Sequence, residues 1–392
     1  MRILLVSDFY PPTPGGLEAH VRLLAEALLR QGHEVAIVSG TPHPDPLPGD
    51  APVHYAPTML SRASRVYANK GRQFPPPFPD PVFRRAVRQV AESWRPDIIH
   101  AHGGWCAFSS YWAGAPPLIV TLHDHGLRCP KRTLLRAKNE CGTGIGRGCI
   151  TCSGDQHVAK RVVLAGALYW SVPKLAAHAS KLIAVSQSVA QRAAQAGVAR
   201  SKITVIPNFC DTASKEPGPA PTKPTVLFVG PDAPHKGRSV AVAAFSRLPS
   251  GSATLVLVGS ENPVSADGVV NRGYLRGAAL WEQYSRATIA VVPAVWPDPC
   301  PTVVLEAMAH GLPIIGSRIG GIPDLVEDGV SGLLISPNEP ARLAESMQVL
   351  LADRQLRDKL GAGARQRSLM FDTEVVVPQV RDVYQSTLSE VI

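Results

Sequence analysis

Short, almost wholly apolar runs recur along the first half of the chain, and segments with a helical spacing of apolar residues lie between them. The runs are RILLVS (2–7), EVAIVS (34–39), DIIHAH (97–102), LIVTLHD (118–124), KLIAVS (181–186) and KITVIP (202–207). Between the first two runs, Leu17, Val21, Leu24 and Leu28 fall on one helix face, and Gly32 ends that helix. Strand, helix, strand repeats with near-continuous apolar strands predict a parallel sheet that is buried on both faces.

The same pattern resumes after a polar, proline-rich stretch. Residues 211–224 (DTASKEPGPAPTKP) contain almost no bulky apolar side chain and predict an interdomain linker. Five further strand candidates follow: TVLFVG (225–230), ATLVLVGS (253–260), ATIAVVPA (287–294), PIIGS (313–317) and GLLIS (332–336). Helical patterns then run from about residue 339 to the end. We expect a Rossmann-like domain over 1–210, a second over 225–372, and a C-terminal helix over 373–392 that could cross back to the first domain. A cleft facing the carboxyl ends of both sets of strands is the default active site.

The segment WPDPCPTVVLEAMAHGLP (296–313) places two carboxylates eight positions apart around a proline-rich turn. Its three alternating prolines exclude regular helix, so we expect the next helix to begin at about Thr302, with Thr302 as its N-cap. Asp298 then lies in a loop over the helix N-terminus, and Glu306 lies one turn inside the helix. The N–H groups of that terminus, including those of Thr302 and Val303, favour phosphate. For an arbitrary Asp and Glu at this spacing, a solvated loop and a helix surface are the more frequent outcome.

Two further loops carry residues that suit a phosphate group. Gly15 and Gly16 come directly before the first predicted helix, where backbone N–H groups can hold a diphosphate. The chain lacks the G-x-G-x-x-G pattern there, which disfavours a nicotinamide enzyme. After the strand that ends at Gly230, Lys236 can reach phosphate as a point charge, with Arg238 as a helper. A plain glycine turn and an exposed loop lysine are the alternatives.

Histidines end two consecutive predicted strands. His100 and His102 end one strand, and His123 and His125 lie at the end of the next. Because the carboxyl ends of parallel strands meet at one edge of a sheet, we expect these side chains to line the site rather than the core. A metal cluster and hydrogen bonds to a sugar hydroxyl both fit this pattern.

Composition and charge narrow the class of partner. Hydrophobic residues make up 45% of the chain and charged residues 18%, which is typical of a folded globular protein. No apolar run approaches the roughly 18 residues that cross a bilayer, and no signal-peptide pattern opens the chain, so we expect a cytoplasmic protein. The net charge of +9 is uneven, because residues 1–212 carry +11 and the remainder −2. This excess could be solvated surface, or it could attract an anionic, lipid-linked acceptor or the cytoplasmic membrane face. No nucleic-acid-binding motif accompanies it.

Four of the seven cysteines lie in a basic, glycine-rich insertion over 128–155. They are Cys129, Cys141, Cys149 and Cys152, and the last two form a C-x-x-C unit. In a cytoplasmic chain, such cysteines more often hold a metal than form disulfides. The insertion is too polar to form its own core, so a structural tetrahedral zinc is the leading interpretation. Free thiols or disulfides follow closely, and an iron–sulfur cluster is the third alternative. The insertion comes directly after the predicted strand with His123 at its end, so it could form a lid or wall over a substrate pocket there.

Taken together, the ordered motifs resemble those of the retaining glycosyltransferases of family 4, which have the two-domain GT-B fold. The blocks that carry the resemblance span nearly the whole chain: GGLEAHVRLLAEALLRQGHEVAIVS, PDIIHAH, VTLHD, IAVSQSV, ITVIPNFCD, FVGPDAPHKG, VLEAMAHGLPII and GGIPDLVEDGVSGLLI. The resemblance implies an α/β fold of two Rossmann-like, doubly wound domains that face a central cleft. It also implies that the second domain binds a nucleoside diphosphate sugar and that the first domain supplies the acceptor site.

The resemblance gives the candidate residues separate roles. Glu306 matches the glutamate that holds the nucleotide ribose, Lys236 the diphosphate lysine, Gly16 the glycine at the diphosphate, and His123 the histidine that faces the donor sugar. Asp298 stands where the family usually has a glutamate near the transferred sugar. Transfer would retain the anomeric configuration and would need no metal, because cationic side chains and helix N-termini neutralise the leaving diphosphate.

Three positions depart from the family pattern. Pro231 stands where an arginine is usual, which removes a cation from the diphosphate site, although Arg238 or Arg318 could replace it. Asp298 is one methylene shorter than glutamate, and Pro301 replaces a common glycine. These departures favour a weaker or differently tuned donor site.

The leading interpretation is a hexosyltransferase that acts on a sugar or polyprenyl-linked acceptor in polysaccharide or glycoconjugate biosynthesis. Two alternatives stay open: a catalytically weakened GT-B protein that acts as a partner or regulator, and a nucleotide-sugar epimerase or phosphorylase of the same fold. The cysteine insertion favours transfer, since an epimerase needs no second substrate pocket. The sequence identifies neither the base, the sugar nor the acceptor.

Overall fold

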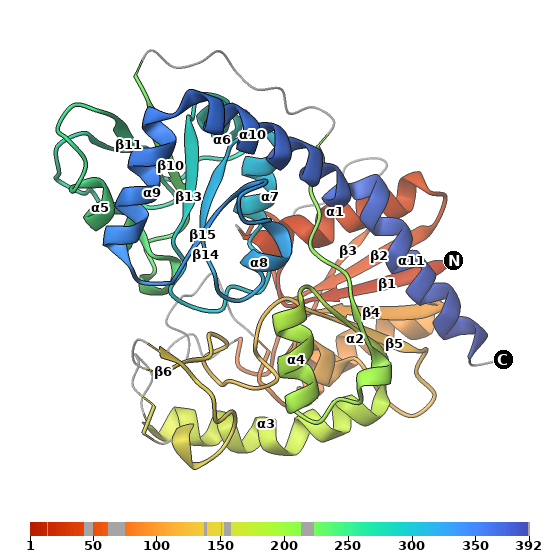
Figure 1. Cartoon of the computed structure of the whole chain (residues 1–392). Helices are drawn as coiled ribbons and strands as arrows, with labels where there is room; N and C mark the ends of the chain where they lie inside the picture. The colour runs from red at the N-terminus through yellow and green to blue at the C-terminus, as the bar shows by residue number, and fades with distance from the viewer. Residues whose placement is uncertain are drawn as a thin grey trace. The chain divides into compact units, whose positions relative to one another are not determined.

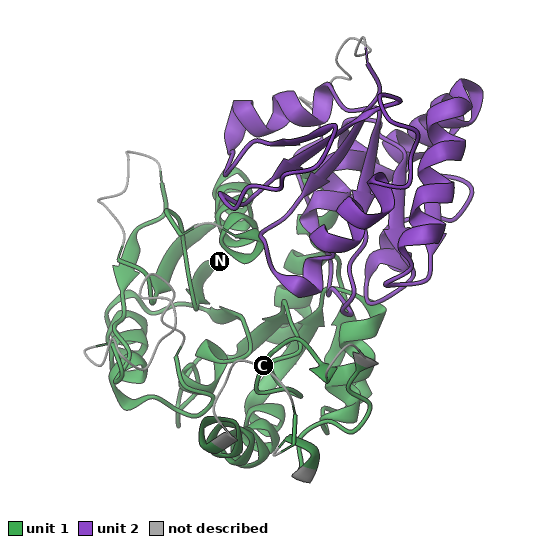
Figure 2. Ribbon diagram, turned by 90° about the vertical axis from the view of Figure 1, so that its left-hand side faces the viewer, with its two compact units in different colours: residues 1–208, 373–392 green, residues 209–372 purple. Residues whose placement is uncertain are grey.

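The computed structural model describes residues 1–13, 15–42, 50–61, 75–136, 139–149, 151–152, 158–212 and 223–390. The chain forms two compact units, drawn in green and purple in Figure 2. Unit 1 comprises Met1–Asn208 and Thr373–Ile392, and unit 2 comprises Phe209–Asp372. Most of the predicted linker (213–222) lies outside the described residues, as do 137–138, 150 and 153–157 in and after the cysteine insertion.

Unit 1 is built on a seven-stranded parallel sheet (Figure 1) with the order β3-β2-β1-β4-β5-β8-β9. Its strands are β1 (Arg2–Ser7), β2 (Glu34–Ser39), β3 (Val53–Tyr55), β4 (Ile98–His102), β5 (Leu118–Leu122), β8 (Ala179–Ala184) and β9 (Ile203–Val205). Strands β4 and β5 are buried at every residue, as expected of parallel strands covered on both faces. The strand order reverses between β1 and β4, so the carboxyl ends of these strands are the place where an α/β fold binds ligands.

The helices of unit 1 follow the apolar pattern of the sequence. They are α1 (Gly16–Arg30), α2 (Pro81–Trp94), α3 (Val158–His178), α4 (Gln187–Gln195) and α11 (Thr373–Ser389). On α1 the predicted face is buried, with Val21, Leu24 and Leu28 fully enclosed. Helix α11 packs beside α1 and therefore completes unit 1 with the last segment of the chain.

Unit 2 holds a six-stranded parallel sheet with the order β12-β11-β10-β13-β14-β15. Its strands are β10 (Thr225–Val229), β11 (Thr254–Val258), β12 (Val269–Asn271), β13 (Ile289–Val292), β14 (Ile314–Ser317) and β15 (Gly332–Ile335). Its helices are α5 (Arg238–Phe245), α6 (Gly277–Ser285), α7 (Thr302–Ala309), α8 (Ile322–Leu325), α9 (Pro340–Ala352) and α10 (Arg354–Ser368). Phe228, Leu257 and Met347 belong to one apolar core that joins the sheet to α5 and α9. The order reverses between β10 and β13, so the loops after these two strands mark the candidate ligand edge.

Every predicted strand is present within a few residues, and the two parallel-sheet units confirm the α/β class. The prediction missed β3 and β12, two three-residue edge strands, and the small hairpin of β6 (Leu135–Arg136) and β7 (Asn139–Glu140). The predicted N-cap was wrong, because Pro301 is the cap of α7 and Thr302 is its first helical residue. Proline is accepted there because the cap residue keeps an extended backbone (φ −70°, ψ 116°).

Candidate functional site

Asp298 lies in the loop after β13, and its partner Lys236 lies in the loop after β10. The Lys236 Nζ is 2.6 Å from Asp298 Oδ2, and the Trp296 Nε1–H donates to the same oxygen at 3.1 Å. Asp298 is almost fully buried, whereas 28% of the Lys236 side chain is exposed. Two residues that the sequence motifs treat separately therefore form one ion pair at the point where the strand order of unit 2 reverses.

Close backbone approaches at two glycines set the positions of these loops. Gly237 has a left-handed backbone (φ 80°), and a Cβ there would lie 1.8 Å from the carbonyl oxygen of Pro293. Gly320 (φ 64°) approaches Asp298 similarly, and its Cβ would lie 2.4 Å from the Asp298 carbonyl oxygen. Only glycine combines this backbone conformation with this proximity. The ion pair therefore depends on contacts that no larger side chain would allow.

Glu306 lies on α7 and is oriented by Tyr284 of α6. The Tyr284 hydroxyl donates to Glu306 Oε2 at 2.7 Å. Burial raises the pKa of Tyr284 well above its usual range, and the charge of Glu306 raises it further, so the phenol remains a donor. His310 stacks on the Tyr284 ring at 5.2 Å, and its Nδ1 is 2.8 Å from the Glu306 carbonyl oxygen. Glu306 itself is only partly buried, so its carboxylate is held in one orientation at a partly open position.

The other residues predicted to bind phosphate in unit 2 differ in their surroundings. Thr302 and Val303 are the first two residues of α7, both partly exposed, and N–H groups of a first helical turn have no intrahelical acceptor. Arg238 is buried, and its guanidinium pairs with Asp232 at 3.0 Å and donates to the Asn262 carbonyl oxygen at 2.6 Å. The structure ties Arg238 to neighbouring loops of unit 2, and its phosphate role stays a prediction.

Unit 1 gathers histidines at the carboxyl ends of β4 and β5. One ring nitrogen from each of His20 (on α1), His102 and His123 lies within 4.8 Å of the other two. Among the described residues, no other group of three or more histidine, cysteine or carboxylate side chains has this spacing. His102 Nδ1 and His123 Nε2 share a hydrogen bond at 3.2 Å, and Asn208 also binds the His123 ring. Burial lowers the pKa of His123 to about 4, so the ring is neutral near pH 7. A neutral ring here suits a hydroxyl group better than a phosphate.

Gly15 and Gly16 lie at the start of α1, one turn before His20. Gly15 is the cap residue and Gly16 the first helical residue, and both are exposed. No side chain caps this terminus through a hydrogen bond. An exposed helix start without a cap has N–H groups that can meet an anion. The role of the two glycines at a diphosphate stays a prediction.

Sequence reasoning missed a buried charge group at the same edge of unit 1. The Arg132 guanidinium pairs with Asp8 at 3.3 Å, and its Nε–H donates to Asp124 at 2.6 Å. Asp8 is fully buried directly after β1; burial raises its pKa, and the charge of Arg132 opposes that rise. The sequence did show an aspartate after each of two apolar strands, which could have indicated the two carboxylates. Their partner Arg132 belongs to the cysteine insertion, whose position in the fold cannot be predicted from a strand pattern.

The sequences of both units match profiles of known protein families. The family profile described as Glycosyltransferase Family 4 matches residues 14–214, half of the chain, and the profile of the glycosyl transferases group 1 matches residues 211–367. The chain belongs to glycosyltransferase family 4.

This family 4 glycosyltransferase is similar to glycogen synthase of Mycobacterium tuberculosis (strain ATCC 25618 / H37Rv). The two are 28% identical over 416 residues, which cover 98% of this chain and 94% of that protein. Two solved structures share the fold. Sucrose-phosphate synthase of Thermosynechococcus elongatus has a TM-score of 0.77 at 21% identity over 99% of both chains. Anabaena HepE in complex with UDP-glucose has a TM-score of 0.72 at 20% identity over 98% of this chain and 100% of that one. The structures confirm the GT-B fold, and the family confirms a transferase.

Two further expectations concern the glycosyltransferase as a whole. Among the described residues, no helix combines the length and the apolar character needed to cross a membrane. Cys129, Cys141, Cys149 and Cys152 line one pocket of unit 1, and none of the seven cysteines, all of which lie in the described part of the chain, forms a disulfide. The position of these four cysteines around one pocket is therefore consistent with the prediction that they bind one metal ion together. The metal ion itself stays a prediction.

Proposed function

We propose that this glycosyltransferase transfers a hexose from a nucleoside diphosphate sugar to a sugar or lipid-linked acceptor, with retention of the anomeric configuration. The observation that supports it most is the arrangement in unit 2, where Lys236 and Asp298 pair at the carboxyl ends of the neighbouring strands β10 and β13. A lysine and the uncapped N-terminus of α7 at such an edge suit a diphosphate. Glu306 follows on the same helix and can accept hydrogen bonds from ribose hydroxyls.

The ion pair gives Asp298 a second task in this proposal. Its carboxylate fixes the position of Lys236 Nζ, which would otherwise be the mobile end of a flexible side chain. Negative charge builds up on the leaving diphosphate as the glycosidic bond breaks. Contacts from Lys236 and from the N–H groups of Thr302 and Val303 strengthen as that charge grows, and such a differential contact lowers the barrier.

Tyr284 acts as a positioning residue for the donor. Its hydroxyl donates to one oxygen of Glu306 at 2.7 Å, and this hydrogen bond orients the carboxylate that is proposed to bind the ribose. In unit 1, the neutral ring of His123 is proposed to bind a hydroxyl group of the transferred sugar, and Gly15 and Gly16 to meet the diphosphate. The complex of HepE with UDP-glucose makes UDP-glucose the first donor to test, and the relative named glycogen synthase supports a sugar acceptor.

The surface of α3 supports a lipid-linked acceptor at a membrane face. Val163, Tyr169 and Trp170 are 66%, 76% and 54% exposed, and Lys174 Nζ lies 3.2 Å from the centre of the Trp170 ring. Exposed aromatic rings beside a cation are the residue types that bind at a bilayer interface. Flotation with vesicles of phosphatidylglycerol should recover the wild-type protein and fail for a Tyr169→Ser/Trp170→Ser variant. Equal flotation of both, or of neither, would argue against this contact.

Product analysis tests the proposed reaction. The enzyme is incubated with UDP-, ADP- and GDP-linked hexoses and candidate acceptors, and the anomeric configuration of the product is read by NMR. We expect an α-linked product from an α-linked donor, and a rate lowered by roughly 100-fold in Lys236→Met. Lys359→Met, which removes an exposed lysine of the same unit, is the matched control and should keep the full rate. An inverted product would contradict retention, and equal rates for the two variants would contradict the diphosphate role of Lys236.

A further inference from the structure

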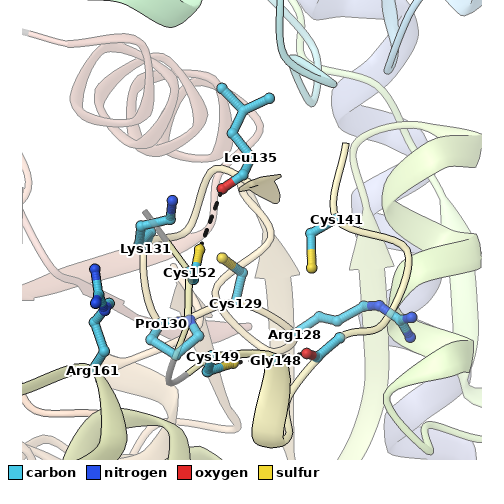
Figure 3. A pocket seen from close by; sticks show the side chains of 11 residues that line it. Arg128, Cys129, Pro130, Lys131, Leu135, Cys141, Gly148, Cys149, Cys152 and Arg161 are labelled. Atoms are coloured by element: carbon cyan, nitrogen blue, oxygen red, sulfur yellow. Dashed lines mark hydrogen bonds between the residues drawn. The ribbon is translucent and has the colours of Figure 1, made fainter. Parts of the chain in front are cut away.

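The cysteine insertion of unit 1 brings four cysteines to one pocket (Figure 3). Cys129, Cys141, Cys149 and Cys152 all line it, with the side chain of Leu135 nearby. Cys129 begins a tight turn, because the Arg132 N–H donates to its carbonyl oxygen at 2.9 Å. Cys141 directly follows the β6–β7 hairpin, and Cys149 ends a short 3₁₀ turn. Four cysteines of one insertion that line the same small pocket, with no disulfide between them, are the ligand set of a tetrahedral metal site.

The space around the sulfurs and a hydroxyl beside one of them suit a small ion. The pocket has a volume of about 20 Å³. A cavity that holds a single water molecule needs about 10–15 Å³, so there is room for one small ion. The Thr143 hydroxyl lies 3.5 Å from Cys141 Sγ. A donor at this distance stabilises negative charge on the sulfur and orients a thiolate toward a metal. A zinc ion bound here requires each sulfur to lie about 2.3 Å from it.

Three cations surround the same pocket. Arg128, Lys131 and Arg161 line it together with the cysteines. A zinc ion bound by four thiolates carries two net negative charges, which neighbouring cations offset. Two disulfides would be neutral and would gain nothing from this basic lining. Charge therefore favours a metal over oxidation of the thiols.

The insertion has little else to hold its shape. Among its described residues, Leu134 is the one fully buried aliphatic side chain. Arg132 (φ 66°) and Leu134 (φ 52°) both have left-handed backbone, a conformation that residues other than glycine adopt at a cost. A segment with one buried aliphatic residue and two strained positions needs another source of order.

The same turn delivers Arg132 to the edge of the unit 1 sheet. Arg132 lies three residues after Cys129, and its guanidinium reaches Asp8 and Asp124, which follow β1 and β5. Without this guanidinium, the carboxylate of Asp8 would be buried without its charge partner. The conformation of the Cys129 turn therefore decides whether that carboxylate is neutralised.

We propose that Cys129, Cys141, Cys149 and Cys152 bind one structural zinc ion, and that this ion fixes the turn that holds Arg132 against Asp8 and Asp124. The site lies outside the donor machinery proposed for unit 2, so it does not depend on which sugar is transferred. Zinc fits four thiolates in a closed tetrahedron and needs no added sulfide, which an iron–sulfur cluster would.

Metal content tests the ligand set. Protein purified in a reducing, chelator-free buffer should contain about one zinc per chain by elemental analysis. Cys141→Ser and Cys149→Ser should each lose most of it, while Cys210→Ser, which removes a buried thiol outside the pocket, should keep it. Cobalt substitution of the wild type should give the absorption of a tetrahedral thiolate site. Less than about 0.2 zinc per chain, iron with sulfide instead of zinc, or disulfides in the mass map would each overturn the proposal.

Hydrogen exchange tests what the ion holds, and it needs no variant that could fail to fold. Removal of zinc from the wild type with a strong chelator should speed amide exchange at residues 125–136 and 141–149, and added zinc should restore protection. The sheet of unit 2 is the internal control and should exchange unchanged. Equal exchange with and without zinc would overturn the claim that the ion fixes the Arg132 turn.

Discussion

The ion pair between Lys236 and Asp298 leads to a prediction about the stability of unit 2. Its Nζ and Oδ2 atoms lie 2.6 Å apart, and the side chain of Asp298 is only 6% exposed. Removing one partner of a fully buried pair costs about 3–5 kcal/mol. Lys236 is 28% exposed, and the Trp296 Nε1–H still donates to Asp298, so we expect Lys236→Met to cost less, about 2 kcal/mol.

A double-mutant cycle isolates the contribution of the pair. Asp298→Asn removes the opposite charge and leaves a lysine that can turn toward water, so it should cost about 1 kcal/mol. The double variant should lose no more stability than Lys236→Met alone, because neither charge is then left without its partner. The coupling should therefore be at least about 1 kcal/mol in urea unfolding followed by circular dichroism.

An exposed pair of the same unit is the matched control. Arg342 and Glu345 lie 2.9 Å apart, and their side chains are 68% and 59% exposed. Their cycle should give a much smaller coupling than that of Lys236 and Asp298, because solvent screens an exposed pair. A coupling below about 0.3 kcal/mol for Lys236 and Asp298, no larger than that of the control, would refute the view that the carboxylate fixes the lysine.

Three other predictions concern separate parts of the chain. Gly237→Ala should prevent stable folding of unit 2, because its Cβ would overlap a backbone carbonyl oxygen, whereas Gly251→Ala, with the same sign of φ but open space around it, should cost only about 1–2 kcal/mol in urea unfolding. Tyr284→Phe should weaken nucleoside diphosphate binding about 10-fold in titration calorimetry, because Glu306 loses the hydrogen bond that orients its carboxylate. An unchanged affinity would show that Tyr284 does not position Glu306 for binding. The pKa of His123 is about 4 in the folded protein and near 6.5 in the unfolded chain, so only the unfolded chain binds a proton as the pH falls from 7.5 to 5. This difference should lower the free energy of unfolding by about 2 kcal/mol over that range. A His123→Asn variant should lose less stability over the same range.

The strands were predictable because their signal is local. In β1, β2 and β10 a continuous apolar run bounded by polar residues already encodes a buried parallel strand, and the observed bounds agree closely. The edge strand β3 escaped because only Val53 of its three residues is even partly buried, so no apolar run marks it. The N-cap of α7 was predicted one residue too late, because threonine is a preferred N-cap residue. In the structure Pro301 occupies the N-cap position with an extended backbone.

The candidate site was predictable as a set of residues but not as a set of contacts. The motifs marked Lys236, Asp298 and Glu306, yet the pairing of the first two depends on which strands neighbour one another in the sheet. Tyr284 carried no motif and was found only through its hydrogen bond to Glu306. Arg132 was one of many basic residues in a polar insertion, and although Asp124 lies close to it along the chain, its other partner Asp8 follows the first strand, 124 residues away. Such long-range electrostatic contacts follow from topology, which a local pattern does not contain.

Nucleoside diphosphate binding tests the central claim most directly. A thermal-shift panel compares uridine, adenosine and guanosine diphosphates on the wild type and on Glu306→Ala. At about 100 times its dissociation constant, the matching diphosphate adds about 2.7 kcal/mol of stability, which should raise the melting temperature of unit 2 by about 5 °C or more. We expect one diphosphate to give that shift with the wild type and none with Glu306→Ala. No shift with any of the three, or an equal shift in the variant, would contradict a donor site built on Glu306.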